Sequence, residues 1–306
     1  MRDVARAAGV SVAVVSYCFN HPERVASVTR ERVLATARSL DYTGANAAAR
    51  ALRTGRTGVI GLVCGRENRS PLDDLPDIQI ARGVANVCTQ EGLSLLLAPR
   101  TGSPMDGLIV VGDHPDPPLH PVVYIHDAAG RGDAPHVACD LDTGIRDVAS
   151  LLTALGHRSI AVLGYPGDGE RRAAAARHLG TADALTVYEA TSRRHSEGHL
   201  AARAALAAPA RPTAVIGLSG DLASGAFDLC LRLGLRVPGD VSVVGVDDTP
   251  DAAALGITSV AVPHRETGEI AMGLLRAALR GQPAPRVPRL PAPLIVRAST
   301  GPVAGS

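Results

Sequence analysis

The first forty residues carry apolar side chains at helical spacing, in short segments separated by turn signals. A helix is predicted over 3–8, and Gly9 ends it. A second helix is predicted over 12–19, with Ser11 placed to cap its first free N–H groups. The apolar face of the first helix is formed by Val4, Ala7 and Ala8. Two short helices around a tight turn form the helix-turn-helix plan, whose second helix can enter the DNA major groove.

A third helix is predicted over 29–40 and would complete a small all-α head over 1–45. Its apolar stripe consists of Val33, Leu34, Ala37 and Leu40. The next segment, 46–57, contains an alanine-rich helix candidate followed by a Gly- and Thr-rich linker. A helix this short is marginal alone in water, so we expect it to order on binding a partner.

From residue 58 the pattern changes to continuous apolar runs of strand length that alternate with helical stretches. The runs lie at 59–63, 93–98, 108–111, 122–125, 160–163, 214–218, 241–246 and 294–296. The helical stretches lie at 78–92, 144–155, 171–179, 197–207, 222–233 and 267–279. This alternation predicts open parallel sheets flanked by helices, and the number of runs favours two doubly wound lobes within a core over 58–306.

The distribution of charge places any nucleic-acid-binding surface in the N-terminal segment. The 306 residues have a net charge of +1, which argues against a protein that coats nucleic acid without specificity. The segment 1–56 is nevertheless basic, because its arginines outnumber its acidic residues. The arginines are Arg2, Arg6, Arg24, Arg30, Arg32, Arg38, Arg50, Arg53 and Arg56, against Asp3, Glu23, Glu31 and Asp41. A basic segment on a neutral body predicts a local phosphate-binding surface.

The cysteines and the hydropathy pattern bear on the compartment. The 5 cysteines are scattered and form no C-x-x-C pair, which favours reduced, buried thiols. We find no secretory leader pattern and no apolar run of the roughly 20 residues that a membrane helix needs. The expectation is a soluble cytoplasmic protein without a membrane partner.

Polar residues follow several of the apolar runs. His126, Asp221 and Asp247 each stand just past such a run. In open α/β sheets ligands bind outside the carboxyl ends of the strands, so the spacing predicts a polar cleft lined by these three side chains. For Asp221, which precedes the helix predicted at 222–233, a helix cap is an equal alternative.

Three patterns that resemble catalytic or metal motifs favour structural interpretations. The segment 217–221 lacks the final glycine of a nucleophile elbow, and the glycines between 164 and 169 do not form G-x-G-x-x-G. The histidines between 114 and 136 have proline-rich surroundings and no metal-ligand spacing. The run 193–195 is interpreted as a solvated helix start. We therefore predict no catalytic residues, no cofactor and no metal.

Several separate motifs, in order, resemble the LacI/GalR family of bacterial transcriptional regulators. They are Asp3-Val4-Ala5, Gly9-Val10-Ser11, Val15-Ser16, Asn20, Thr29 to Leu34, Ala49 to Arg56, Ile60 to Val63, Leu155 to Ala161 and Leu233 to Asp248. The resemblance covers nearly the whole chain. It implies a two-lobed, periplasmic-binding-protein-like core, with lobe 1 at about 58–128 and 263–281 and lobe 2 at about 129–262 and 282–298.

The family resemblance also implies the function and the partners. It implies a repressor that binds a palindromic, double-stranded operator as a homodimer, or a larger assembly such as a tetramer, and associates with the bacterial nucleoid. A small-molecule effector, such as a sugar or another metabolite, would bind between the lobes and change their angle. Corepression and activation are equally compatible with this sequence.

The resemblance assigns DNA contacts to residues of the head and of the hinge helix. The full set is Ser11, Val12, Ala13, Ser16, Tyr17, Asn20, Thr29, Ala49 and Leu52. Val12, Ala13 and Tyr17 match base-reading positions, and Tyr17 departs from the family's usual arginine. Leu52 matches a leucine that wedges into the minor groove and kinks the duplex, with packing inside a dimer as its alternative.

For the effector, the resemblance assigns His126, Arg172, Asp221 and Asp247, with Arg171 as a close rival of Arg172. Aromatic residues are only 2% of the chain, so few rings are available to stack on a sugar. The segment 98–105 is also too short for the helix that usually joins two strands of lobe 1. These departures support two alternatives: a regulator that has lost its effector response and, in a different class, a solute-binding protein.

Overall fold

A computed structural model of the chain describes residues 1–42, 55–65, 72, 74–98, 103–112, 121–126, 134–180, 184–283 and 285–303. The chain divides into two compact units. The first comprises Met1–Val59 with Gly102–Asp106, and the second comprises Ile60–Thr101 with Gly107–Ser306. The predicted hinge helix, with Ala49 and Leu52, lies outside the described residues. No helix in the described ranges is long and apolar enough to cross a membrane.

The head is built from three short helices and one 3₁₀ turn. These are α1 (Arg2–Ala8), α2 (Val12–Asn20), η1 (Pro22–Arg24) and α3 (Ser27–Ser39). Gly9 ends α1 in the left-handed region at φ 65°, a conformation that suits glycine. The helices enclose a small core made of Val4, Ala5, Ala8, Val15, Cys18, Val33 and Ala37.

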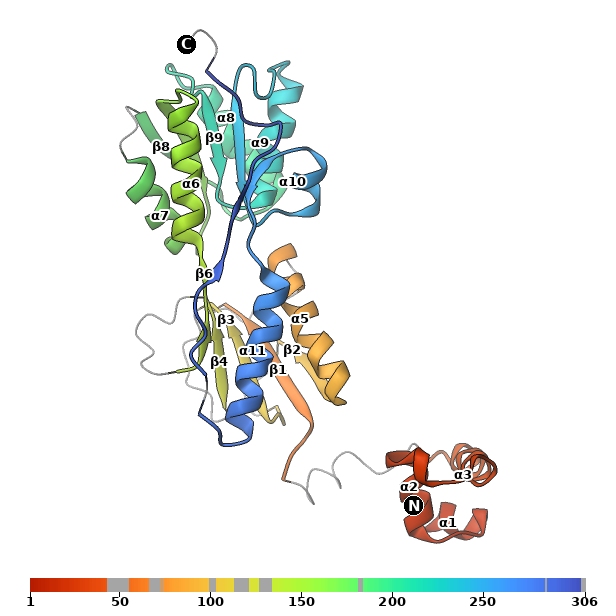
Figure 1. Cartoon of the computed structure of the whole chain (residues 1–306). Coiled ribbons are helices and arrows are strands. Elements are labelled where there is room, and N and C mark those ends of the chain that lie inside the picture. The colour runs from red at the N-terminus through yellow and green to blue at the C-terminus, as the bar shows by residue number, and fades with distance from the viewer. Residues whose placement is uncertain are drawn as a thin grey trace. The chain divides into compact units, whose positions relative to one another are not determined.

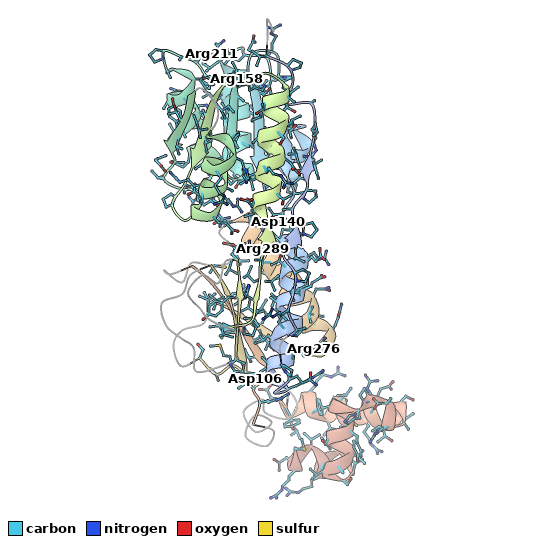
Figure 2. All side chains as sticks on the ribbon, turned by 60° about the vertical axis from the view of Figure 1, so that its left-hand side comes forward. Asp106, Asp140, Arg158, Arg211, Arg276 and Arg289 are labelled. Carbon is cyan, nitrogen blue, oxygen red and sulfur yellow. The ribbon has the colours of Figure 1, made fainter. Side chains whose placement is uncertain are left out.

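Two residues of the predicted head core are in fact exposed. Ala7 is exposed, and Ala5 takes its place, because α1 packs through its 4, 5 and 8 positions. Leu40 is 46% exposed because it is the C-cap of α3 and lies beyond the last buried turn. Toward the other end of this unit, the Asp106 carboxylate accepts hydrogen bonds from the backbone N–H of Thr57 at 2.6 Å and of Gly58 at 2.9 Å. Asp106 is labelled in Figure 2.

Lobe 1 is a five-stranded sheet in the order β2-β1-β3-β4-β5. Its strands are β1 (Val59–Cys64), β2 (Ser94–Leu97), β3 (Gly107–Val111), β4 (Val122–Ile125) and β5 (His136–Val137). The pairings of β1 with β3, β3 with β4 and β4 with β5 are parallel. Since β5 belongs to this sheet, the change of lobe lies after residue 137, and the predicted boundary near 128 was too early. The sequence pattern missed β5 because the strand is short and its first residue, His136, is polar.

Helices α5 (Leu75–Glu91) and α11 (His264–Leu279) lie side by side along this sheet (Figure 1). They approach closely because glycines face the contact. A Cβ at Gly83 would lie 2.1 Å from the Arg265 carbonyl oxygen, and one at Gly268 would lie 2.3 Å from that of Ile80. Between β2 and β3 the chain spans only 98–106, and the described residues there, 98 and 103–106, form no helix.

Lobe 2 is a six-stranded sheet in the order β13-β11-β10-β9-β7-β8, parallel except where β13 pairs with β11. Its strands are β7 (Ser159–Gly164), β8 (Ala184–Glu189), β9 (Ala214–Gly217), β10 (Ser242–Val246), β11 (Thr258–Val260) and β13 (Leu294–Ile295). Its helices are α6 (Leu141–Ala154), α7 (Gly169–Leu179), α8 (His195–Leu206), α9 (Gly220–Arg232) and α10 (Pro250–Ala254). A parallel two-stranded pair joins β6 (Cys139–Asp140), which directly precedes α6, to β12 (Leu290–Pro291), which lies between α11 and β13.

The structure confirms the predicted fold class, an all-α head with a two-lobed core of parallel sheets, and adds elements that the apolar pattern had missed. β8 is an edge strand in which Thr186, Val187 and Glu189 are exposed, so it lacks a continuous buried apolar run. β11 is fully buried but begins with Thr258 and Ser259, whose hydroxyls are satisfied by hydrogen bonds. All 5 cysteines are buried and none of them forms a disulfide bond, as expected.

Candidate DNA-reading surface and interlobe cleft

Helix α2 presents a mixed small and aromatic surface to solvent. The Ser11 hydroxyl caps the helix by accepting a hydrogen bond from the Val14 N–H at 3.3 Å. Val12 is 43% exposed, Tyr17 is 40% exposed and Ala13 is also exposed, while Val15 faces the head core. The helix therefore buries one face and leaves free the three side chains that the sequence assigned to base reading.

The remaining predicted DNA contacts are less fully described. Ser16 and Thr29 are half-buried, Thr29 in the first turns of α3. Asn20 is the last residue of α2, and its side chain lies outside the description. The exposed guanidinium groups of Arg2, Arg6 and Arg24 add positive charge to this unit.

Three side chains from separate elements meet at the carboxyl end of β10. Two of them, Asp247 and His264, line a cleft between the lobes together with Leu75 and Gln79 of α5. The Asp247 carboxylate accepts two hydrogen bonds from Arg171 of α7, at 2.7 and 2.8 Å. It also pairs with Nε2 of His264, the first residue of α11, at 2.8 Å. Arg171 also donates to the Leu218 carbonyl oxygen at 2.7 Å. All three side chains are buried, so the charges of Arg171 and Asp247 are balanced inside the protein.

Electrostatics fix the ionised state of this cluster. Burial alone would raise the pKa of Asp247, but Arg171 and His264 hold it well below its usual range. Burial also opposes the charge on Arg171, yet the Asp247 carboxylate keeps the pKa of that guanidinium above its usual value. Asp247 has a positive φ of 86°, which aims its side chain away from the direction of an ordinary strand.

The structure brings Arg171, and not the predicted Arg172, to Asp247. Arg172 is on the adjacent side of α7, where it pairs with Asp168 at 3.0 Å and with Glu189 of β8. Its side chain is 33% exposed, against 9% for Arg171. Consecutive residues of a helix point about 100° apart, so the double arginine could not be resolved from the sequence.

His126 lies just after β4, where its backbone N–H donates to the Val137 carbonyl oxygen at 2.9 Å. Its φ of 78° is unusual for a residue other than glycine. Burial, together with the positive neighbours His264, Arg171 and Arg193, lowers the pKa of His126 to about 3. The imidazole is therefore neutral at neutral pH.

Asp221 does not cap α9, the alternative that the sequence had left open. The cap is Ser219, whose hydroxyl accepts a hydrogen bond from the Leu222 N–H at 3.2 Å. Asp221 is half-buried in the first turn of the helix. Burial and the charges of Asp247 and Asp74 raise the pKa of its carboxyl group.

The sequence missed a second charged cluster that joins the lobes. Arg193 precedes α8 in lobe 2, and its Nε lies 3.0 Å from the Asp74 Oδ2 at the start of α5 in lobe 1. Its Nη2 lies 3.7 Å from the Asp77 Oδ2, and its guanidinium stands over the Tyr165 ring at 5.6 Å from the centroid. The Arg193 side chain is only 15% exposed, so the predicted solvated helix start is wrong at this residue. No local signal relates residues 74 and 193.

Comparisons with known proteins agree with this architecture. A family model described as bacterial regulatory proteins, lacI family, matches residues 1–44. Another, described as a periplasmic binding protein-like domain, matches residues 149–300. An HTH-type transcriptional regulator of Mycobacterium tuberculosis is 31% identical over an aligned length of 313, and the alignment covers 87% of each chain.

Two further relatives extend the likeness over nearly the whole chain. The HTH-type transcriptional repressor PurR of Erwinia tasmaniensis is 30% identical over 310 residues, covering 90% of this chain and 89% of that protein. A crystal structure of the lac repressor dimer, bound to operator and the anti-inducer ONPF, is 25% identical and has a TM-score of 0.79. That match covers 98% of each chain.

Proposed function

Since the chain belongs to the lacI family of bacterial regulatory proteins and is a DNA-binding transcriptional regulator rather than an enzyme, we propose that it is a repressor. In this proposal two copies bind the two halves of a palindromic operator, and a small molecule between the lobes controls the affinity. The protein acts in the bacterial cytoplasm on double-stranded DNA. A dimer suffices for this function, and a tetramer would bind two such operators.

The observation that carries the DNA-reading part is the exposed face of α2. Val12 and Ala13 offer only apolar contact, for example to a thymine methyl group, whereas Tyr17 adds a hydroxyl that can donate or accept a hydrogen bond. Specificity then depends strongly on phosphate contacts and on DNA shape. Ser11, Ser16, Asn20 and Thr29 are our candidates for the phosphate contacts. The Ala49 and Leu52 segment is our candidate for the minor-groove wedge.

The effector part of the proposal rests on the polar groups around Asp247. Asp247 and Asp221 supply carboxylates, His126 a neutral imidazole and Arg171 a guanidinium. Arg172, which the sequence assigned to the effector, lies on the more exposed side of the same helix turn and would contact an effector only at the edge of the site. A ligand that binds one angle between the lobes more tightly than another shifts the population of that angle. Induction and corepression differ only in which angle favours DNA.

Selection of binding sites from random DNA tests the operator proposal. We expect the wild-type protein to select an inverted repeat and Tyr17→Ala to change the preferred bases within each half-site. Asn20→Ala is the comparison variant and should weaken binding to all sequences alike. An unchanged base preference in Tyr17→Ala would remove the base-reading role of that residue. Selection of a single half-site would contradict the dimeric operator.

A regulator without an effector response is the second candidate. It is favoured by one observation, namely that Asp247 is already paired with both Arg171 and His264. Operator titrations and thermal shifts across a metabolite panel separate the two. A compound that changes both the melting temperature and the operator affinity rejects the effector-free candidate.

A further inference from the structure

A single carboxylate holds the two residues through which the linker from the head reaches β1. The Asp106 Oδ1 accepts hydrogen bonds from the Thr57 backbone N–H at 2.6 Å and from the Thr57 hydroxyl at 2.8 Å. The Asp106 Oδ2 accepts another from the Gly58 backbone N–H at 2.9 Å. The Thr57 hydroxyl in turn accepts a hydrogen bond from the Val59 N–H at 3.1 Å. Both carboxylate oxygens of Asp106, the residue labelled in Figure 2, are thus bonded to the linker.

The sheet does not need these hydrogen bonds. β1 and β3 are paired in parallel from Ile60 and Gly107 onward. The Asp106 backbone N–H continues this pairing, because it donates to the Val59 carbonyl oxygen at 2.8 Å. The carboxylate reaches beyond that point, to Thr57 and Gly58, which precede the strand. The carboxylate therefore holds the end of the linker rather than the strand.

The local sequence of the linker does not fix its own conformation. Gly55 and Gly58 have φ values of 67° and 72°, in the left-handed region that glycine enters without steric cost. Apart from chain neighbours, no described residue comes within 4 Å of a Cβ built at either glycine. Side-chain packing at these two positions therefore does not select the conformation. Hydrogen bonds to a carboxylate are short and strong, so those to Asp106 are the restraint that selects it.

The restraint lies on the covalent path from the DNA-binding head to the core. The lacI family model matches residues 1–44, and β1 begins at Val59. When two heads are tethered to one dimer, the binding of the second head depends on how the tether presents it to its half-site. Each residue that is fixed at the end of the tether narrows the range of positions that the head can reach.

We propose that Asp106 is a positioning residue for DNA binding, which clamps Thr57 and Gly58 and so sets the spacing of operator half-sites that a dimer prefers. This inference rests on the proposed binding of a palindromic operator by two copies. Asp106 acts through the linker and contacts neither base nor phosphate. Without its carboxylate, two more residues of each tether are unrestrained, which weakens binding to paired half-sites and widens the accepted spacing.

Operator titrations with full sites and single half-sites test the inference in the full-length chain. Asp106→Ala should bind a full inverted repeat about tenfold more weakly than the wild type, and a single half-site within about twofold of it. Insertion of a base pair at the operator centre should weaken wild-type binding about tenfold and Asp106→Ala binding only about threefold.

Asp240→Ala is the matched control for the loss of a carboxylate that orders a loop. Asp240 also accepts a backbone N–H, that of Arg236 at 2.8 Å, but it lies between α9 and β10 in lobe 2. The control should bind full sites, half-sites and the lengthened operator as the wild type does. Changes in Asp240→Ala equal to those in Asp106→Ala would overturn the inference.

Variants of Thr57 keep the inference testable if Asp106→Ala does not fold. Thr57→Val removes the hydroxyl but keeps the shape and the backbone N–H, so it should show the same two changes at a smaller size. Thr57→Ser retains the hydroxyl and should bind like the wild type. Equal losses of affinity for full sites and half-sites in Asp106→Ala and Thr57→Val overturn the inference, because a lower fraction of folded protein explains them.

The wild-type measurements separate this inference from the proposed function. Wild-type protein that selects no inverted repeat contradicts the proposed function itself. If the wild type prefers one spacing and both Asp106→Ala and Thr57→Val keep that preference, the proposed function stands and the positioning role of Asp106 is wrong. Relaxed spacing in these two variants, with half-site affinity unchanged and with Asp240→Ala like the wild type, supports both.

Discussion

The head and the interlobe cleft arrange their functional side chains in opposite ways. In the head, a core of small apolar residues holds α2 so that Val12, Ala13 and Tyr17 face solvent. In the cleft, Arg171, Asp247 and His264 are buried and bound to one another. The head thus presents its groups to a partner, whereas the cleft pairs Asp247 with Arg171 and His264 inside the protein.

This difference predicts how strongly substitutions in each region should lower the free energy of unfolding. A DNA-reading surface loses little stability when one exposed side chain is removed, because solvent replaces the lost contact. A buried ionic cluster loses far more when one member is removed, because the remaining charges stay desolvated. Variants in the cleft should therefore act through stability and lobe geometry, and variants on the exposed face of α2 through DNA affinity.

The largest effect is expected from Arg171→Met. The change keeps the apolar stem but leaves Asp247 with His264 alone, so the free energy of unfolding should fall by about 3–5 kcal/mol. Urea unfolding of the full chain measures it. Arg172→Met is the comparison variant and should cost less, about 1 kcal/mol, because the Arg172 side chain and Glu189 are solvated, although its other partner, Asp168, is buried. Similar losses in both variants would contradict the distinction between the two arginines.

Arg171 and Arg172 show which features of the structure the sequence can predict and which it cannot. Helical spacing predicts the helix at 171–179 and the family resemblance places one of its arginines at the effector site, but the choice between Arg171 and Arg172 depends on how α7 packs against its neighbours, among them α6. The strands with continuous apolar runs were equally predictable, since burial on both faces leaves a local pattern. β8 is an edge strand and left no such pattern.

Long-range partners explain the rest of what the sequence could not provide. Arg193 pairs with Asp74 across 119 positions (193 minus 74), and nothing near either residue encodes that meeting. The same holds for His264, which was not among the predicted cleft residues although it contacts Asp247. Asp221 was predicted as a cap or a ligand contact, and only the geometry assigns the cap to Ser219.

The second effect concerns the pH dependence of the core. His126 is neutral in the folded protein down to a pKa of about 3, whereas in the unfolded chain it titrates near 6.5. Below pH 6.5 the unfolded state binds the proton first, so stability falls as the pH falls toward 3. At pH 5 this loss is up to about 2 kcal/mol relative to pH 7.

Urea unfolding at pH 7 and pH 5 of the wild type and of His126→Asn checks this contribution. The variant should lose less stability than the wild type between the two pH values. His136→Asn is the control and should follow the wild type, because that imidazole is exposed on β5. If His126→Asn loses as much stability as the wild type between pH 7 and pH 5, His126 is not the group responsible for the pH dependence of the free energy of unfolding.

A third, smaller effect tests whether the head depends on its apolar core alone. Val33 is fully buried in α3, so Val33→Ala removes two buried methyl groups and should cost about 1.5 kcal/mol. Operator binding by Val33→Ala should then fail at a lower temperature than operator binding by the wild type, while the unfolding transition of the two-lobed core stays in place. Val28→Ala on the same helix is the control, since Val28 is 77% exposed. Equal effects of both changes would contradict the assigned core.

The smallest effect separates two roles of Ser11, the cap of α2 and a phosphate contact. Ser11→Ala removes the acceptor for the Val14 N–H and should cost about 1 kcal/mol, seen as faster hydrogen exchange of that amide. Ser39→Ala, at the far end of α3, is the control for loss of a hydroxyl. Ser11→Asp preserves the cap but places a negative charge beside the DNA, so it should restore slow exchange and still weaken operator binding. If Ser11→Asp restores both properties, Ser11 acts only through the helix, and the phosphate contacts of the head must come from other residues.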